Sequence, residues 1–142
     1  MEPRISLVTF GVSDLARAKA FYEALGWRGQ EVEETVFIQA GGLALVLWDA
    51  SKLADDAGLS DIPTGHSGAI VLAHNVRSAE EVSEVVSAAV DAGATVTKAP
   101  TETSYGGYAA CFADPDGHIW EIAYNPGFPL ASDGSLTLPH FD

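Results

Sequence analysis

The sequence contains a single cysteine and only seven basic residues among its 142. Cys111 has no partner for an internal disulfide, and a CxxC redox or zinc motif would need a second cysteine. No apolar run approaches the roughly 18 residues that a membrane-spanning helix requires. The first ten residues also lack the basic flank and long apolar stretch of a secretory signal. These absences predict a cytoplasmic protein with no membrane partner.

The scarcity of basic residues leaves a strongly acidic chain. Twenty acidic against seven basic side chains give a formal charge of −13. A field of this sign repels phosphate groups and anionic lipids, which argues against nucleic acid as a partner and favours cationic ligands. Solubility alone would also explain the charge. The hydrophobic share of 47% is ordinary for a globular domain, so we expect one domain over residues 1–142.

Residues 5–50 have the pattern of one strand, one helix and three further strands. The β-rich segment 5–12 ends at the helix-start residues Ser13 and Asp14. Apolar residues then recur at helical spacing until Gly26, which is a typical residue after a helix end. Three short β-like segments follow, at 27–31, 36–40 and 43–48.

The same order returns in residues 67–126. A strand at 68–76 leads to Ser78, which is followed three residues later by Glu81 in the pattern of a capping box, and a helix is predicted to about Ala92. Strands are then predicted at 95–98, 108–113 and 118–124. The polar segment 51–66 is interpreted as a linker, and residues 127–142 as an irregular tail that lies along a partner subunit.

The duplication itself predicts how the chain folds. A half that cannot close its own core must pack against the other half. The predicted fold class is therefore α+β, with two βαβββ repeats that form a curved, cup-like mixed sheet and helices on its outside.

Three segments resemble the vicinal oxygen chelate superfamily, which includes glyoxalase I, extradiol dioxygenases, fosfomycin-modifying enzymes and bleomycin-resistance proteins. These segments are 11–15 (GVSDL), 21–26 (FYEALG) and 112–121 (FADPDGHIWE). They occur in the family's order and spacing, and the likeness covers about residues 5–126. The resemblance implies the glyoxalase/bleomycin resistance fold and a small-molecule ligand.

In the metal-dependent members of this family, four side chains bind a divalent ion, one on the first and one on the last strand of each repeat. The resemblance places these positions at Leu7, at Val71, within residues 45–47 and at Glu121. Three of the four positions are aliphatic, and a lone carboxylate holds a divalent ion too weakly to organise catalysis. We therefore expect no metal, no cofactor and no catalytic residue. A rearranged metal site that uses His66 and Glu121 is the remaining metal hypothesis.

Side-chain alternation assigns Leu7, Thr9, Val71 and Glu121 to the interior of the predicted cup. A mostly apolar interior with one acid suits an organic ligand. Glu121 either anchors that ligand or is retained from the family without a ligand role, with its carboxylate hydrogen-bonded to backbone donors or water. The other predicted ligand contacts are an aromatic residue at the rim, a histidine near the mouth and a loop with two tyrosines, namely Trp48, His66, Tyr105, Gly106 and Tyr108. Core packing is the favoured alternative for the tryptophan, and a simple hairpin turn is the alternative for the loop.

Two functional hypotheses follow. The first is a homodimeric binding protein, similar to the metal-free bleomycin-resistance branch, that sequesters an antibiotic or another aromatic or cationic natural product without turnover. The alternative is a glyoxalase-like lyase, isomerase or dioxygenase with a non-standard metal site or metal-free acid–base chemistry at Glu121. A housekeeping domain of another function also stays open, because fold alone does not determine function. The metal-poor pocket and the acidic charge favour the binding hypothesis, so the sequence argues against an enzyme.

Overall fold

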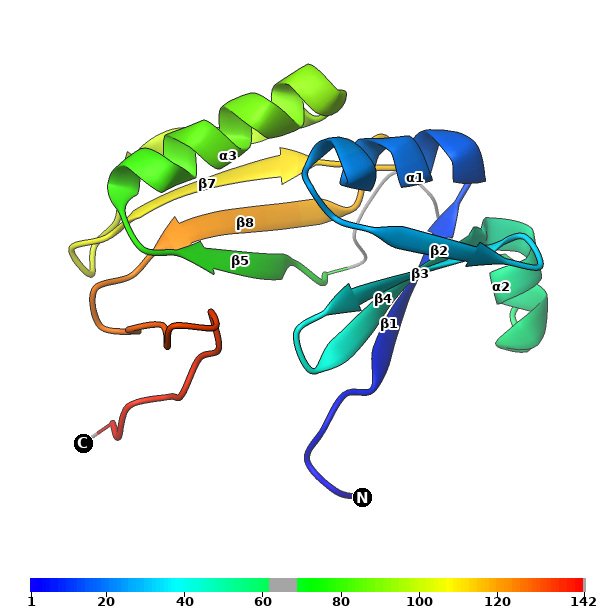
Figure 1. Ribbon diagram of the computed structural model, residues 1–142, viewed down its shortest axis with the longest axis horizontal. Coiled ribbons are helices and arrows are strands. Elements are labelled where there is room, and N and C mark those ends of the chain that lie inside the picture. The colour runs from blue at the N-terminus through cyan, green and yellow to red at the C-terminus, as the bar shows by residue number, and fades with distance from the viewer. Residues whose placement is uncertain (62–68, 142) are drawn as a thin grey trace. The chain divides into compact units, whose positions relative to one another are not determined.

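The computed structural model describes residues 1–61 and 69–141, and its chain divides into two compact units (Figure 1). Unit 1 comprises residues 1–69 and 115–118, and unit 2 comprises residues 70–114 and 119–142. Each unit contains a four-stranded mixed sheet and a long helix. The predicted α+β fold with two βαβββ repeats is therefore confirmed.

Sheet A of unit 1 has the strand order β1-β4-β3-β2. Strand β1 runs parallel to β4, and the other neighbours are antiparallel. The elements of this unit are β1 (Leu7–Val12), α1 (Leu15–Ala24), β2 (Gly29–Val32), β3 (Thr35–Ala40), β4 (Leu43–Asp49) and α2 (Ala50–Asp56).

Sheet B of unit 2 repeats this topology with the order β5-β8-β7-β6, and β5 again runs parallel to β8. Strand β6 continues four residues beyond the end that the sequence predicted, with register irregularities along its length. The elements are β5 (Leu72–Val76), α3 (Ala79–Ala92), β6 (Thr95–Glu102), β7 (Tyr108–Ala113) and β8 (Ile119–Tyr124).

Side-chain caps begin both long helices, as the sequence predicted. The Asp14 carboxylate accepts a hydrogen bond from the backbone N of Arg17, at 2.9 Å. The Ser78 hydroxyl accepts one from the backbone N of Glu81, whose own carboxylate accepts from the backbone N of Arg77. Such caps satisfy amide groups that have no partner within the helix.

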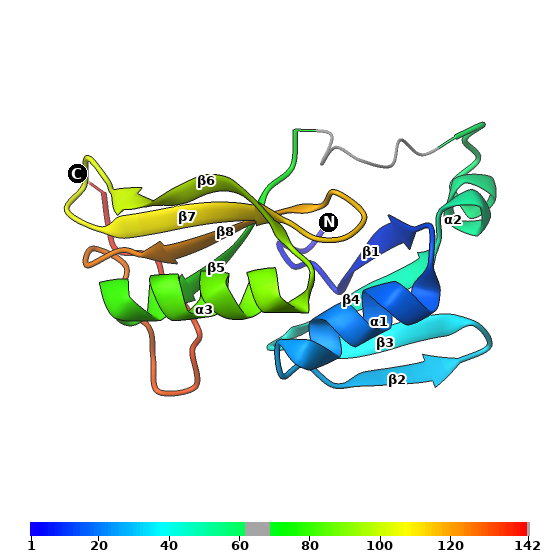
Figure 2. The same cartoon turned by 90° about the horizontal axis from the view of Figure 1, so that it is seen from above.

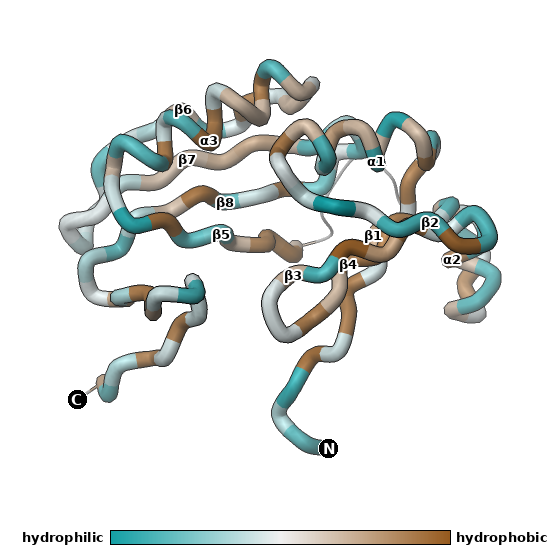
Figure 3. The backbone as a smooth tube through the Cα atoms, viewed as in Figure 1, coloured by the Kyte–Doolittle hydropathy of each residue, from teal (hydrophilic) through white to brown (hydrophobic). Residues whose placement is uncertain are grey.

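Each long helix runs along one face of its own sheet and buries an apolar stripe there (Figure 2). In unit 1 the buried residues are Ala18, Phe21 and Tyr22 of the helix and Val36, Ile38, Leu45 and Leu47 of the sheet. In unit 2 they are Val82, Val86 and Ala89 of the helix and Ala110, Phe112, Trp120 and Ile122 of the sheet. Apolar residues are concentrated along the central strands, most visibly β4 (Figure 3).

Helix α2 lies largely where the sequence predicted a linker over 51–66. The Asp49 carboxylate caps this helix by accepting hydrogen bonds from the backbone N of Ser51 and Lys52. Ala54 is only 3% exposed, and a Cβ added at Gly11 would lie 3.2 Å from Ala50, so the helix packs against β1. The polar composition of 51–66 predicted a linker, but Asp49, just before it, caps a helix.

The rest of the predicted linker, 62–68, lies outside the described residues. Among the residues that are described, no helix is long and apolar enough to cross a membrane. The single cup formed by both sheets stays a prediction.

Candidate functional site

The strand registers identify equivalent positions in the two sheets. In sheet A, Thr9 of β1 lies opposite Val46 of β4. In sheet B, Ala73 of β5 lies opposite Glu121 of β8. Both pairs lie three positions before the last pair of their parallel ladder. Val46 is therefore the counterpart of Glu121, which identifies the family position that the sequence placed only within residues 45–47.

Glu121 belongs to a row of residues that crosses sheet B. The register continues from Ala73 and Glu121 to Cys111 of β7 and then to Lys98 of β6, and we call these four residues the Glu121 row. Because side chains alternate along each strand, the row lies on the face opposite α3. The residues that alternate with it, including Phe112, are buried on the helix side.

The two charged side chains of this row act on the Cys111 thiol. Burial, followed by the nearby Glu121 carboxylate, raises the pKa of the Cys111 thiol, and the Lys98 ammonium opposes this increase. The thiol is therefore neutral at neutral pH and is a poor nucleophile. Glu121 is half-buried, so its carboxylate is both accessible and partly shielded from water. Such a carboxylate can anchor a cation or accept a hydrogen bond from a ligand.

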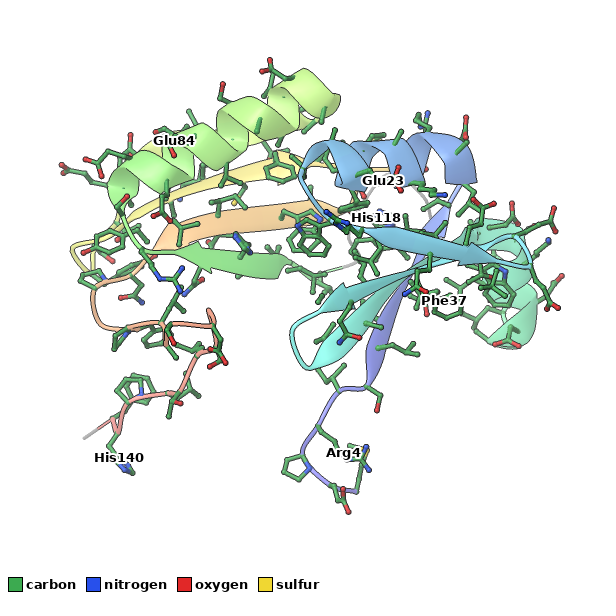
Figure 4. The ribbon with its side chains drawn as sticks, viewed as in Figure 1. Arg4, Glu23, Phe37, Glu84, His118 and His140 are labelled. Carbon is green, nitrogen blue, oxygen red and sulfur yellow. The ribbon has the colours of Figure 1, made fainter. Side chains whose placement is uncertain are left out.

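The equivalent row of sheet A carries no formal charge. It consists of Thr9, Val46, Phe37 and Gln30, which we call the Val46 row. Val46 is 5% exposed, whereas Phe37 is 41% exposed and offers an aromatic surface (Figure 4). Leu7, two residues before Thr9 on the same face, is half exposed.

The other predicted ligand residues occupy different places. Trp48 alternates in phase with Val46 and is half-buried, so it lies on the face opposite α1. Val71 immediately precedes β5 and is exposed. His66 lies outside the described residues.

The predicted loop with two tyrosines is a turn between β6 and β7. Tyr105 is exposed in this turn, and Gly106 has a positive φ of 80°, a conformation that glycine adopts without strain. Tyr108 lies opposite Tyr124 and alternates in phase with the buried Phe112. The register therefore places Tyr108 on the face that α3 covers, away from Glu121.

The segment Asp114–Gly117 contains a structural contact that sequence reasoning missed. The Asp116 carboxylate accepts hydrogen bonds from the backbone N and the hydroxyl of Ser13, both at 2.9 Å, and from the guanidinium of Arg17 at 3.1 Å. Its side chain is 1% exposed and lies beside the N-terminus of α1, where a negative charge is favourable. The motif therefore supports α1 within unit 1.

His118, two residues after Asp116, also packs within unit 1. Its ring stacks on Phe10 of β1, with the two centroids 4.1 Å apart and an angle of 11° between the rings. His118 is thus part of the packing around β1.

The residues at the family's metal positions do not fit a four-ligand site. Leu7, Val46 and Val71 have no atom that coordinates a metal, which leaves only the Glu121 carboxylate. Across residues 1–61 and 69–141, no group of three or more His, Cys, Asp or Glu side chains could hold a metal ion.

Comparison with known proteins identifies the family. The model of the Glyoxalase/Bleomycin resistance protein/Dioxygenase superfamily matches residues 4–122. The chain belongs to this superfamily. No curated protein matches the sequence. The resemblance of the three sequence segments to this superfamily is thereby confirmed.

Solved structures of the superfamily share this fold. A glyoxalase-related enzyme from Fulvimarina pelagi is 36% identical, covers 97% of this chain and 99% of its own, and superposes with a TM-score of 0.89. A glyoxalase/bleomycin resistance protein/dioxygenase family enzyme from Burkholderia phytofirmans PsJN is 27% identical, with coverages of 84% and 96% and a TM-score of 0.72. A lactoylglutathione lyase from Agrobacterium tumefaciens is 19% identical, with coverages of 86% and 93% and a TM-score of 0.66, and shares the fold alone.

Proposed function

We propose that the protein binds a small organic molecule at the Glu121 row and holds it without chemical turnover. This proposal depends on the side chains at the four metal-ligand positions of the family. Leu7, Val46 and Val71 are aliphatic, and Glu121 is the one polar side chain of the four. In the Glu121 row the carboxylate lies between Ala73 and Cys111, with the Lys98 ammonium at the far end, so a carboxylate and uncharged groups lie side by side for an organic guest.

The charges favour a cationic or aromatic natural product, such as an antibiotic, as the ligand. The formal charge of −13 attracts cations towards the protein, and Glu121 can pair with one on arrival. Cys111 and Ala73, on either side of Glu121, can contact an uncharged part of the same ligand. The exposed residues Leu7 and Phe37 would be covered by a second copy of the chain in a homodimer. The cytoplasmic location stays a prediction.

Isothermal titration calorimetry with metal-free bleomycin and the planar cation acridine orange tests the proposal. We expect binding of at least one probe, quenching of tryptophan fluorescence, and an affinity roughly fivefold weaker in Glu121→Gln, because one charge contact at about 4 Å is removed. The matched control is Glu84→Gln, which changes an exposed residue on α3 (Figure 4). Absence of binding by both probes, or equal affinities for the two variants, would contradict the proposal.

A second candidate is a glyoxalase-like enzyme, because the 36% identical protein of Fulvimarina pelagi is described as a glyoxalase-related enzyme. In this case Glu121 would act as the general base or acid, with or without a metal ion held in a non-standard way. Elemental analysis of protein purified without chelators, combined with an assay of lactoylglutathione formation from methylglyoxal and glutathione, separates the two candidates. Stoichiometric Ni, Zn, Fe or Mn together with turnover that Glu121→Gln abolishes would favour the enzyme.

A further inference from the structure

Unit 2 contains a cavity whose lining includes Ala73 of the Glu121 row but not Glu121 itself. Its volume is about 550 Å³, within the usual range for small-molecule pockets. It lies between β5, an edge strand of sheet B, and the tail that follows β8, which Figure 1 shows in orange to red. His74, Arg77 and Glu81 line one side, and Leu130, Asp133 and Leu136 line the other.

The tail side of the cavity is held in place by defined hydrogen bonds. The Arg77 guanidinium donates to the carbonyl oxygens of Ala131, at 2.8 Å, and Ser132, at 3.3 Å. Leu130 and Leu136 form an antiparallel bridge, which closes the segment between them into a hairpin. The cavity therefore has two built walls.

The charges that line the cavity are predominantly negative. Glu81 and Asp133 contribute two carboxylates. Glu81 accepts a local hydrogen bond from the backbone N of Arg77, and Asp133 accepts from both the backbone N and the side chain of Ser135. Arg77 provides the opposing positive charge, and its guanidinium already donates hydrogen bonds to the tail carbonyls. Burial lowers the pKa of His74, so its imidazole is neutral at neutral pH and adds no second positive charge.

Apolar side chains complete the lining. Val76, at the end of β5, is buried beside the cavity, and Leu136 is 43% exposed on the opposite wall. A ligand that fills this cavity would contact both apolar side chains and two carboxylates. The lining therefore favours a molecule that has a cationic end and an apolar body.

We propose that this cavity binds a small protonated amine that carries an apolar group. The ammonium donates hydrogen bonds to the Glu81 and Asp133 carboxylates, and the apolar group packs against Val76, Leu130 and Leu136. The net charge of the whole chain, −13, disfavours a carboxylate or phosphate ligand of the same shape.

Three probes of similar shape and different charge test this proposal on ¹⁵N-labelled protein: 2-phenylethylamine, 2-phenylethanol and phenylacetate. We expect only the amine to shift the backbone amide signals of residues 74–77 and 130–136. Glu81→Gln and Asp133→Asn should each weaken amine binding roughly fivefold, since one charge contact is removed while the acceptor oxygen of the local hydrogen bond is kept. Glu84→Gln on the same helix is the matched control.

Two results would overturn the proposal. One is an equal response of these amide signals to the neutral alcohol, and the other is unchanged amine affinity in both Glu81→Gln and Asp133→Asn. Glu121→Gln separates this site from the one proposed above, because it should leave the amine-induced shifts intact. If that variant abolished them, the amine would belong to the Glu121 row and the cavity proposal would fail.

Discussion

The two sheets have the same strand order and register but opposite chemistry on the faces that their long helices leave uncovered. The Val46 row of sheet A carries no formal charge, whereas the Glu121 row of sheet B carries a carboxylate, a thiol and an ammonium group. The repeated topology is specified by turns, caps and helix-facing apolar residues. Residues on the opposite face contribute less to that topology, so they could diverge towards different roles.

The helix-facing sides also differ in which layer carries the largest fully buried side chains. In unit 1 the largest fully buried side chains, Phe21 and Tyr22, lie on the helix, and Tyr22 also contacts the Phe10 ring of β1, with 6.5 Å between centroids. In unit 2 the helix presents small residues such as Val86, and the large side chains, Phe112 and Trp120, lie on the sheet. Tight packing needs a matched total volume between layers, and either layer can supply it.

The largest expected effect tests this exchange of large and small residues. Phe21→Ala should lower the free energy of unfolding by about 3–5 kcal/mol, because it leaves a cavity under α1. Val86→Ala, which removes less volume under α3, should cost about 2 kcal/mol. Urea unfolding followed by circular dichroism measures both values, and equal losses would contradict the proposed difference between the layers.

Substitutions at the equivalent positions Val46 and Glu121 should produce the next largest effect on the free energy of unfolding. Val46→Glu would place a carboxylate at a position that is 5% exposed, and we expect a loss of about 3 kcal/mol in the free energy of unfolding. Glu121→Val should be neutral or stabilising, because it removes a half-buried charge from sheet B. Similar destabilisation by both substitutions would show that Glu121 has a structural role that Val46 does not share.

Asp116 contributes to unit 1 through hydrogen bonds to the start of α1. Asp116→Ala should cost about 2–3 kcal/mol, because it leaves the donors of Ser13 and Arg17 without this acceptor. Asp91→Ala, at an exposed position on α3, is the control and should change stability by less than about 0.5 kcal/mol. The same unfolding measurement applies, and indistinguishable effects would refute the supporting role.

The smallest expected effect concerns pH and unit 2. Burial lowers the folded-state pKa of His74 below its ordinary value of 6.5, although the Glu81 carboxylate opposes this shift. The unfolded chain therefore binds a proton more readily, so the stability from the neutral imidazole is fully present above about pH 6.5 and declines as pH falls through that value. His74→Gln should flatten this part of the stability–pH curve. NMR titration of the imidazole gives the pKa directly, and a value above 6.5 would reverse the expected sign.

Much of the fold could be predicted because its signals are local. Helical spacing, the caps at Asp14 and Ser78 and the turn at Gly41–Gly42 depend on residues a few positions apart. Helix α2 was missed because an aspartate that caps a helix has the same local appearance as one in a loop. Of the predicted site, Leu7, Thr9, Trp48 and Glu121 lie on the faces opposite the helices. Tyr108 does not, since its sequence context assigns it to a loop, whereas the pairing of Cys111 with Glu121 places it on the other face of β7.

The sequence by itself determined the order of the elements, the duplication, the family and the loss of metal-binding side chains at positions 7 and 71, because each depends on residue type and short-range spacing. Only the tertiary structure decided that Val46 is the counterpart of Glu121 and that Asp116 supports the start of α1. It also decided that the tail and β5 enclose a cavity. These features join residues distant in the chain, and strand register and packing bring such residues together in ways that no local pattern records.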